Sequence, residues 1–199
     1  MPKEIVATEP KDKEWIIVGA GRARYQFRLT SKNRIIPRSD LMAIKVPDST
    51  PEILAQYSLD DEQALLAKVR YNRLIDLFLE LNAFSLQNHL RTTVKGVGQI
   101  EIDELYVGVD KLGRHHVIPV QAKGGTDQIS AVQTGQDISW CSQRFPALRS
   151  RAISAQFMAD DVIAIFELGV EGEDIKVIDE KHYRLVVASD LVEAEITQY

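Results

Sequence analysis

The alternation of apolar and polar residues is strongest near the middle of the chain, where it predicts a β-hairpin. Residues 100–109 are rich in Ile, Val, Leu and Tyr, and residues 116–122 include the run Val-Ile-Pro-Val. Both compositions are typical of strands. Between them Asp110 opens a turn that closes at Gly113, a pattern typical of a type I turn followed by a left-handed glycine. We therefore expect an antiparallel pair with Asp110 opposite Arg114.

This register places three polar side chains on one patch. Counting back from the pair Asp110–Arg114, Asp103 lies opposite Gln121. Side chains alternate along a strand, and directly opposed residues share a face. Asp103, Gln121 and Lys123 should therefore lie together, whereas a slip of one residue would scatter them.

Elsewhere the pattern predicts helices on both sides of the hairpin and strands towards the two ends of the chain. Apolar residues recur three and four apart in the stretch 60–81, which opens with Asp60, Asp61 and Glu62 and has Glu80 near its end. This spacing and these acids are typical of a helix. Further helical segments are expected from Pro51, over 85–92, and over 128–144 with Asp127 as the N-cap. Strands are expected over 15–18, 24–29, 152–158, 162–168 and 183–187, with a turn-like stretch over 169–182.

Composition limits the class of protein without naming a function. The chain has 199 residues, of which 45% are hydrophobic and 27% are charged, as expected for a globular domain. It has no apolar run long enough for a membrane span and no apolar segment typical of a secretion signal. We therefore expect a cytoplasmic protein with no membrane partner. The single cysteine, Cys141, excludes an intrachain disulfide.

Charge is distributed unevenly, which suggests where a polyanion would bind. The net charge is −5, yet the stretch 15–39 contains no acid and six basic residues. With the interleaved Tyr25 and Phe27, this stretch is suited either to nucleic acid or to a plain solvated surface. The candidate DNA-binding residues are the basic Arg22, Arg24 and Arg28, and the polar Asn88, His89 and Arg91 before the hairpin.

The expected patch has the chemistry of phosphodiester hydrolysis. Asp is a hard ligand for Mg²⁺, and the amide oxygen of Gln is a weaker one. A lysine beside them can stabilise developing negative charge and position a water. Here the chain resembles the PD-(D/E)xK nucleases, which include many restriction endonucleases: Asp103 precedes a hairpin, and Gln121-Ala122-Lys123 stands in place of the (D/E)xK tripeptide. Gln121 departs from this motif because it replaces an acid.

The resemblance implies both a fold and an activity. The fold is α/β, with a restriction-endonuclease-like core over 51–199, in which helices flank a mixed central sheet, after a small basic β extension over 1–50. The activity is that of a Mg²⁺-dependent DNA endonuclease of the restriction or defence type, with Mn²⁺ as a substitute metal. Asp103 and Gln121 are the expected metal ligands, Lys123 orients or deprotonates water, and Glu101 or Glu80 adds the missing acid. A duplex cutter needs two sites, so a homodimer is expected.

Other readings stay open at this point. Gln121 leaves room for a nuclease-like module that binds DNA or a protein without cutting. RNA is an alternative substrate. The same residues would also suit an ordinary amphipathic hairpin with a solvated lysine.

Overall fold

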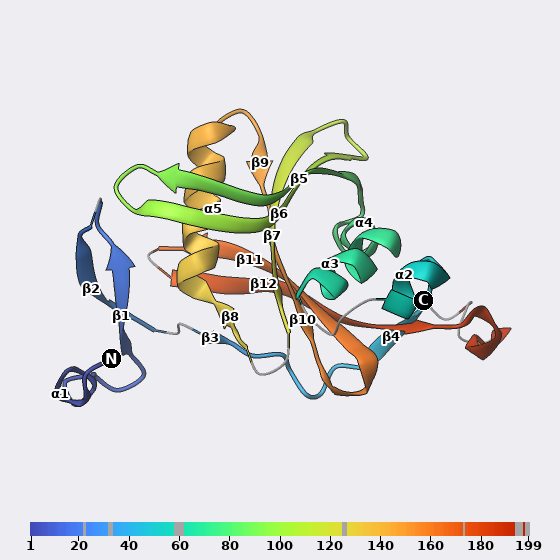
Figure 1. Ribbon diagram of the computed structural model, residues 1–199, viewed down its shortest axis with the longest axis horizontal. Helices are drawn as coiled ribbons and strands as arrows, with labels where there is room; N and C mark the ends of the chain where they lie inside the picture. Colours follow the sequence, from blue (N-terminus) through green and yellow to red (C-terminus); the bar gives the residue numbers. More distant parts are fainter. Residues whose placement is uncertain are drawn as a thin grey trace.

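A mixed β-sheet dominates the structure, a computed structural model that describes residues 1–21, 23–31, 34–57, 62–124, 127–172, 174–193 and 197. Within these residues the sheet has eight strands in the order β4-β12-β11-β10-β7-β6-β5, with β9 beside β7 (Figure 1). Its strands are β4 (Ala43–Pro47), β5 (Leu81–Val94), β6 (Gly98–Asp110), β7 (His115–Lys123), β9 (Arg149–Ser150), β10 (Ala152–Phe157), β11 (Val162–Glu171) and β12 (Asp174–Val186). The expected α/β class is confirmed.

Two small sheets and short helices complete the described chain. The small sheets pair β1 (Glu14–Gly19) with β2 (Tyr25–Thr30), and β3 (Arg34–Ile35) with β8 (Ile129–Ser130). The helices are α1 (Lys3–Val6), α2 (Glu52–Tyr57), α3 (Glu62–Tyr71), α4 (Leu74–Leu79) and α5 (Ala131–Arg144), with 3-10 turns at Ala159–Asp161 and Ala188–Asp190. Among them, no helix is long and apolar enough to cross a membrane.

The central hairpin forms with the predicted register. β6 and β7 pair antiparallel from Glu104–Val120 to Val109–His115, and the amide of Asp110 donates to the carbonyl of Arg114 at 3.1 Å. Gly113 takes a left-handed conformation with φ 73°, as the turn requires.

Helices cover both faces of the sheet because β7 presents apolar side chains to both. Ile118, Val120 and Ala122 pack in one cluster with residues of α3 and α4. Val117, on the other face, packs in a second cluster with Trp140 of α5. β7 and β10 are parallel neighbours, and α5 provides the long crossover that such neighbours need.

The predicted helix over 60–81 is in fact two helices followed by the start of a strand. Arg73 has a φ of 49°, outside the helical region. The side chain of Asn72, beside it, accepts from the amide of Ser49 at 2.6 Å and donates to the carbonyl of Lys68 at 2.9 Å. These bonds end α3 and allow α4 to start in a new direction. The expected opening acids Asp60 and Asp61 lie outside the described residues.

Three further features differ from the sequence prediction. Residues 85–92 were expected to be helical but belong to β5, which pairs with β6 from Leu81–Asp110 to Val94–Gly98. A register shift between Ser85 and Gln87 and a positive φ at His89 disturb the alternation that would have revealed a strand. The stretch 169–182 was expected to be turn-like, but residues 169–171 belong to β11 and residues 174–182 belong to β12. Helix α5 begins at Ala131 with Ser130 as its N-cap, rather than after Asp127.

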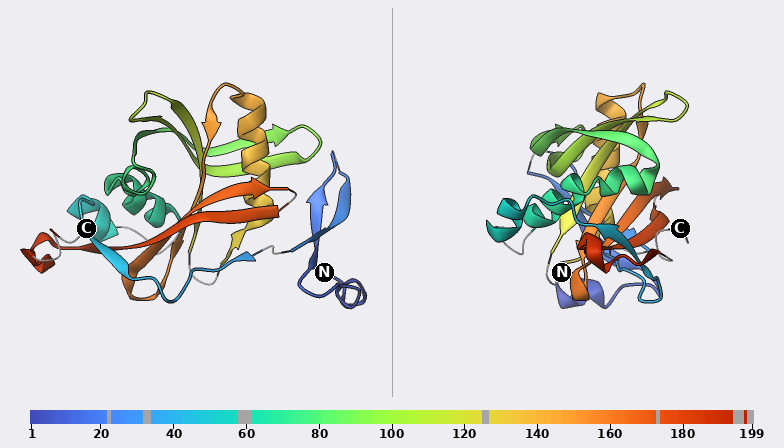
Figure 2. Two further views of the ribbon diagram at one scale, coloured as in Figure 1. Left: turned by 180° about the vertical axis from the view of Figure 1, so that it is seen from behind. Right: turned by 90° about the vertical axis from the view of Figure 1, so that its right-hand side faces the viewer.

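The N-terminal region contributes to more than one sheet. The predicted strands over 15–18 and 24–29 form the β1–β2 hairpin at one end of the molecule, and the C-terminal segment lies towards the other end (Figure 2). β3 pairs with β8, and β4 pairs with β12 of the large sheet. The main sheet therefore takes a strand from the first 50 residues.

Candidate active site

Three of the predicted catalytic residues, Asp103, Gln121 and Lys123, meet where β6 separates from β7. The pairs of the β6–β7 ladder end at Glu104–Val120. Just beyond them, the Oδ2 atom of Asp103 accepts the backbone N–H of Ala122 at 2.9 Å. A carboxylate therefore takes the place of a main-chain acceptor, and Asp103 lies beside the residues that flank Ala122, Gln121 and Lys123.

The amide of Gln121 is held in one orientation by its neighbours. Its Nε2 donates to Oδ2 of Asp137 at 2.8 Å and to the carbonyl of Glu101 at 3.1 Å. Its Oε1 accepts from Nε2 of Gln133 at 2.7 Å. The side chain is only 4% exposed, so the nitrogen is fixed towards α5 and β6 and the oxygen towards Gln133.

Lys123 is paired with an acid from the helix that precedes the hairpin. Its Nζ lies 2.8 Å from Oε1 of Glu62, and the two side chains are 16% and 37% exposed. Glu62 is the first residue of α3. In the sequence it was expected only to open a helix, because an acid in a first turn is already explained by the helix dipole.

The carboxyl groups in this site are affected by burial and by one another. Burial raises the pKa of Asp103, and the negative charges of Glu62 and Glu101 raise it further, against the opposing effects of the Ala122 amide and Lys123. Asp137 is 1% exposed, and burial raises its pKa well above the usual range. Its Oδ1 has no hydrogen-bond partner among the described residues.

The two other acids proposed from the sequence have different surroundings. Glu101 neighbours the site, but its carboxylate pairs with Arg91 at 3.0 Å and His89 at 3.5 Å. The hydrogen bond from Arg91 is the main cause of its lowered pKa. Glu80 is not brought to this site. It caps α4 beside Leu81, which pairs with Asp110 at the turn end of β6, about 20 Å from Asp103 at about 3.3 Å per residue.

The candidate DNA-binding residues do not form one surface. Asn88 lies next to the ion pair of Arg70 and Glu104, whereas His89 and Arg91 contact Glu101. Arg24 and Arg28 are exposed, but they line different hollows. Arg22 lies outside the described residues.

The structure brings four further residues to this site. Glu62, Gln133 and Asp137 contact Lys123 or Gln121, and Arg34 lines a hollow of about 330 Å³ with Lys123 and Gln133. The one local signal was the spacing of Gln133 and Asp137, four apart and therefore on one helix face. This spacing alone does not show which part of the sheet the helix face contacts.

The oxygen donors at the site suit a hard cation. Among the described residues, no group of three or more His, Cys, Asp or Glu side chains could hold a metal ion. Mg²⁺, however, is usually bound through one or two carboxylates and keeps several waters. Asp103 and Glu62, with the amide oxygen of Gln121, offer such a set, whereas the nitrogen and sulfur ligands that zinc prefers do not occur in it.

Comparisons of the chain with models of protein families, with curated proteins and with solved structures find no match. Function is therefore inferred from the site itself. It combines one buried carboxyl group and two half-buried ones, a lysine with an acid partner, and an arginine beside a hollow. These groups can bind a cation, attract a phosphate and position a water.

Proposed function

We propose that this chain is a Mg²⁺-dependent DNA endonuclease with a restriction-endonuclease-like core. The observation that carries the proposal is the convergence of Asp103, Gln121, Lys123 and Glu62 at the end of β7. The chain order of α3, three strands, α5 and β10 supports it, because helices on both faces of a mixed sheet are what the resemblance implies. In this proposal Glu62 supplies the additional acid that the sequence analysis expected from Glu80 or Glu101.

Each of these residues has a distinct role in the proposed mechanism. Asp103, Glu62 and the Oε1 atom of Gln121 would hold Mg²⁺ or Mn²⁺, which supplies positive charge at the scissile phosphate when bound. Lys123 orients or deprotonates the attacking water. The oxygen of that water bonds to phosphorus as one ester P–O bond breaks, and the leaving oxygen takes up a proton. Arg34 attracts the phosphate into the neighbouring hollow.

The first test is cleavage of plasmid DNA by the purified protein in Mg²⁺, Mn²⁺ or EDTA. Lys123→Ala and Glu62→Gln should each lower the rate by roughly a hundredfold or more, since positioned acid–base and electrostatic groups contribute effects of that size. Metal-dependent cutting by the wild type should disappear in EDTA.

Matched control variants come from the turn of the same hairpin and from the end of α4 beside it. Glu80→Gln and Lys111→Ala make the same kinds of change about 20 Å from the site, so both should cut at the wild-type rate. Equal cutting by Lys123→Ala and Lys111→Ala would contradict the proposed role of Lys123.

The competing function is a module that binds DNA or a protein partner without cutting. It is favoured by one observation: the Oε1 atom of Gln121, a proposed ligand, already accepts a hydrogen bond from Gln133. DNA binding without cleavage by well-folded protein in either metal would support this function. An RNA substrate run in parallel identifies a ribonuclease, and light scattering measures the proposed homodimer.

A further inference from the structure

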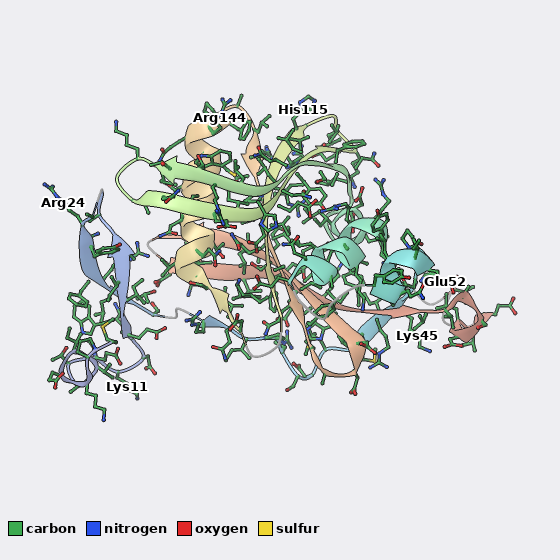
Figure 3. All side chains as sticks on the ribbon, viewed as in Figure 1. Lys11, Arg24, Lys45, Glu52, His115 and Arg144 are labelled. Atoms are coloured by element: carbon green, nitrogen blue, oxygen red, sulfur yellow. The ribbon has the colours of Figure 1, made fainter. Side chains whose placement is uncertain are left out.

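A second hollow lies at the far side of α5, between the N-terminal hairpin and the turn that joins β5 to β6. Its volume is about 810 Å³, within the range of ligand-binding pockets. Gly19 of β1 lets the two elements meet, because a Cβ atom there would lie 2.1 Å from the carbonyl oxygen of Val97. Figure 3 shows Arg24 at the tip of the hairpin, near that turn.

The lining of this hollow combines an aromatic surface with groups that form hydrogen bonds. Arg24 and Tyr25 come from the hairpin, Thr93 and Gln99 from the β5–β6 arm, and Gln136 from α5. Among the described residues, the side chains of Arg24, Tyr25, Gln99 and Gln136 have no hydrogen-bond or ion-pair partner. Unused donors, acceptors and a cation in a concave surface indicate a polar, negatively charged ligand.

The hairpin face that borders the hollow is unusually apolar for a surface. Ile17 pairs with Phe27, and Gly19 pairs with Tyr25, so these side chains share one face. Ile17, Tyr25 and Phe27 are 50%, 76% and 52% exposed. Exposed aromatic rings of this kind provide stacking platforms for nucleic-acid bases.

Charge complementarity indicates the same class of ligand. The stretch 15–39, which includes the hairpin, contains no acid, so all 29 acids of the chain lie elsewhere. A local excess of Arg and Lys on an acidic protein marks the surface that a polyanion would approach.

Two elements, α5 and β6, run from the hollow to the candidate active site. On α5, Gln136 lies one turn after Gln133, which binds Gln121. On β6, Gln99 lies four residues before Asp103, about 13 Å along the strand. This length corresponds to about four stacked nucleotides at about 3.4 Å each. A strand of DNA with its scissile phosphate at Asp103 would therefore reach the hollow within a few nucleotides.

We propose that this hollow, here termed the hairpin groove, binds DNA a few nucleotides from the cleavage point. Tyr25 stacks on a base, Arg24 pairs with a phosphate, and the amides of Gln99 and Gln136 contact a base edge, where paired hydrogen bonds favour adenine. This inference rests on the proposed function in taking DNA as the substrate, and it adds a recognition site to it.

The test measures binding in EDTA, so that cleavage plays no part. Labelled duplex and single-stranded oligonucleotides are titrated by fluorescence anisotropy at low salt. Tyr25→Ala should bind roughly tenfold more weakly, because stacking on one aromatic ring has an effect of this order. The matched control is Tyr57→Ala: Tyr57 is 74% exposed but lies on α2, at the other end of the molecule, where Figure 3 labels Glu52. It should bind as the wild type does.

A second pair of variants tests the phosphate contact. Arg24→Ala should reduce the slope of log affinity against log salt concentration by about one, as expected for the loss of one phosphate contact. Lys111→Ala, on the turn of the β6–β7 hairpin, should leave this slope unchanged.

The outcomes separate this inference from the proposed function. In one outcome the wild type binds DNA and Tyr25→Ala weakens that binding, but neither the wild type nor any variant cuts DNA. This result would confirm that the hairpin groove binds DNA and contradict the proposed nuclease activity. If the wild type cuts and Tyr25→Ala and Arg24→Ala bind normally, then the nuclease stands and the groove is overturned. Absence of DNA binding by the wild type, or tighter binding of RNA of the same sequence, also overturns it.

Discussion

The turn of the β6–β7 hairpin depends on the carboxylate of Asp110. Its Oδ1 accepts the amides of Leu112 and Arg114 at 2.9 and 3.0 Å, and its Oδ2 accepts Nε of Arg114 at 2.7 Å and lies 3.1 Å from Nε2 of His116. Burial acts to raise the pKa of Asp110, but these hydrogen bonds outweigh it and hold the pKa well below its usual range.

Asp110→Asn should therefore destabilise the protein in a pH-dependent way. A lowered pKa in the folded state means that the carboxylate stabilises the fold fully above the ordinary Asp pKa of about 3.9, and loses this effect as pH falls below it. The difference in melting temperature between wild type and variant should be constant from pH 5 to 7 and shrink towards pH 2.5. Calorimetry at several pH values measures it, and a constant difference would contradict the assigned hydrogen bonds.

For Asp137, in contrast, burial outweighs hydrogen bonding and raises the pKa. One of its carboxyl oxygens has no hydrogen-bond partner among the described residues. An unsatisfied buried acceptor costs about 1–3 kcal/mol, and a buried charge adds to this cost. In compensation, Asp137 accepts a hydrogen bond from the amide of Gln121 and thereby fixes the orientation of that amide.

Asp137→Asn should raise the melting temperature at neutral pH by about 3 °C or more, given about 2–4 °C per kcal/mol for a chain of this length. It should at the same time slow DNA cleavage, because the neutral amide no longer holds Gln121 in place as firmly. Differential scanning fluorimetry measures the melting temperature, and the plasmid assay measures the rate of DNA cleavage. A variant that is both less stable and fully active would contradict this account.

The residues of the site differ in how far the sequence could reveal them. Asp103, Gln121 and Lys123 follow from a strand period of two and one recognisable turn, which fix their relative positions locally. Glu62 and Asp137 come from helices on either side of the hairpin. Their positions depend on how α3 and α5 pack against the sheet. The helical periodicity of the sequence shows which face of each helix is buried, but it does not show which residues of the sheet that face contacts.

At the scale of elements, β5 shows why an edge strand is hard to predict. Among the described residues it pairs only with β6, and most of its residues from Phe84 to Arg91 are exposed, so no regular apolar face is required. The backbone irregularities at Leu86 and His89 remove what alternation is left. In contrast, β7 is buried along most of its length and reads as a continuous apolar run.

Substitution of alanine for glycine at two positions tests how the N-terminal hairpin packs against the rest of the molecule. Gly19→Ala places a methyl group against the backbone of Val97, so the N-terminal hairpin must move away from the β5–β6 turn. Residues 14–30 should then exchange amide hydrogens faster, and DNA binding should weaken. Gly135→Ala, inside α5, meets only Ile175 at 3.7 Å and should raise the melting temperature by about 2 °C. Unchanged exchange in Gly19→Ala would contradict the docking.

At the scale of the whole molecule, the strands of the N-terminal region join different parts of the structure. In the part of the chain that the structure describes, the three main apolar clusters include no residue of the β1–β2 hairpin. By contrast, Ile35 of β3 packs beside Phe166 in one of them, and β4 covers the edge of β12. The charge pattern of the sequence carried no information about which strands pair.

Two truncated chains should therefore behave differently. A chain of residues 34–199 should fold, melt close to the full-length protein and lose DNA affinity with the hairpin. A chain of residues 51–199 should be less stable and prone to associate, because it exposes the edge of β12. Melting curves and size-exclusion chromatography compare them. Equal behaviour of the two chains would place the boundary near residue 50 instead.

The hydrogen bond between Asp103 and Ala122 affects how any experiment at Asp103 is interpreted. This carboxylate completes the sheet at the point where β6 turns away, so the side chain that is proposed to bind the metal is also part of the architecture. An alanine there would remove a charge and leave a backbone amide without its acceptor, and the two losses would be indistinguishable in a cleavage assay. Asparagine keeps an oxygen for Ala122 and removes only the charge, so it can separate chemistry from architecture where alanine cannot.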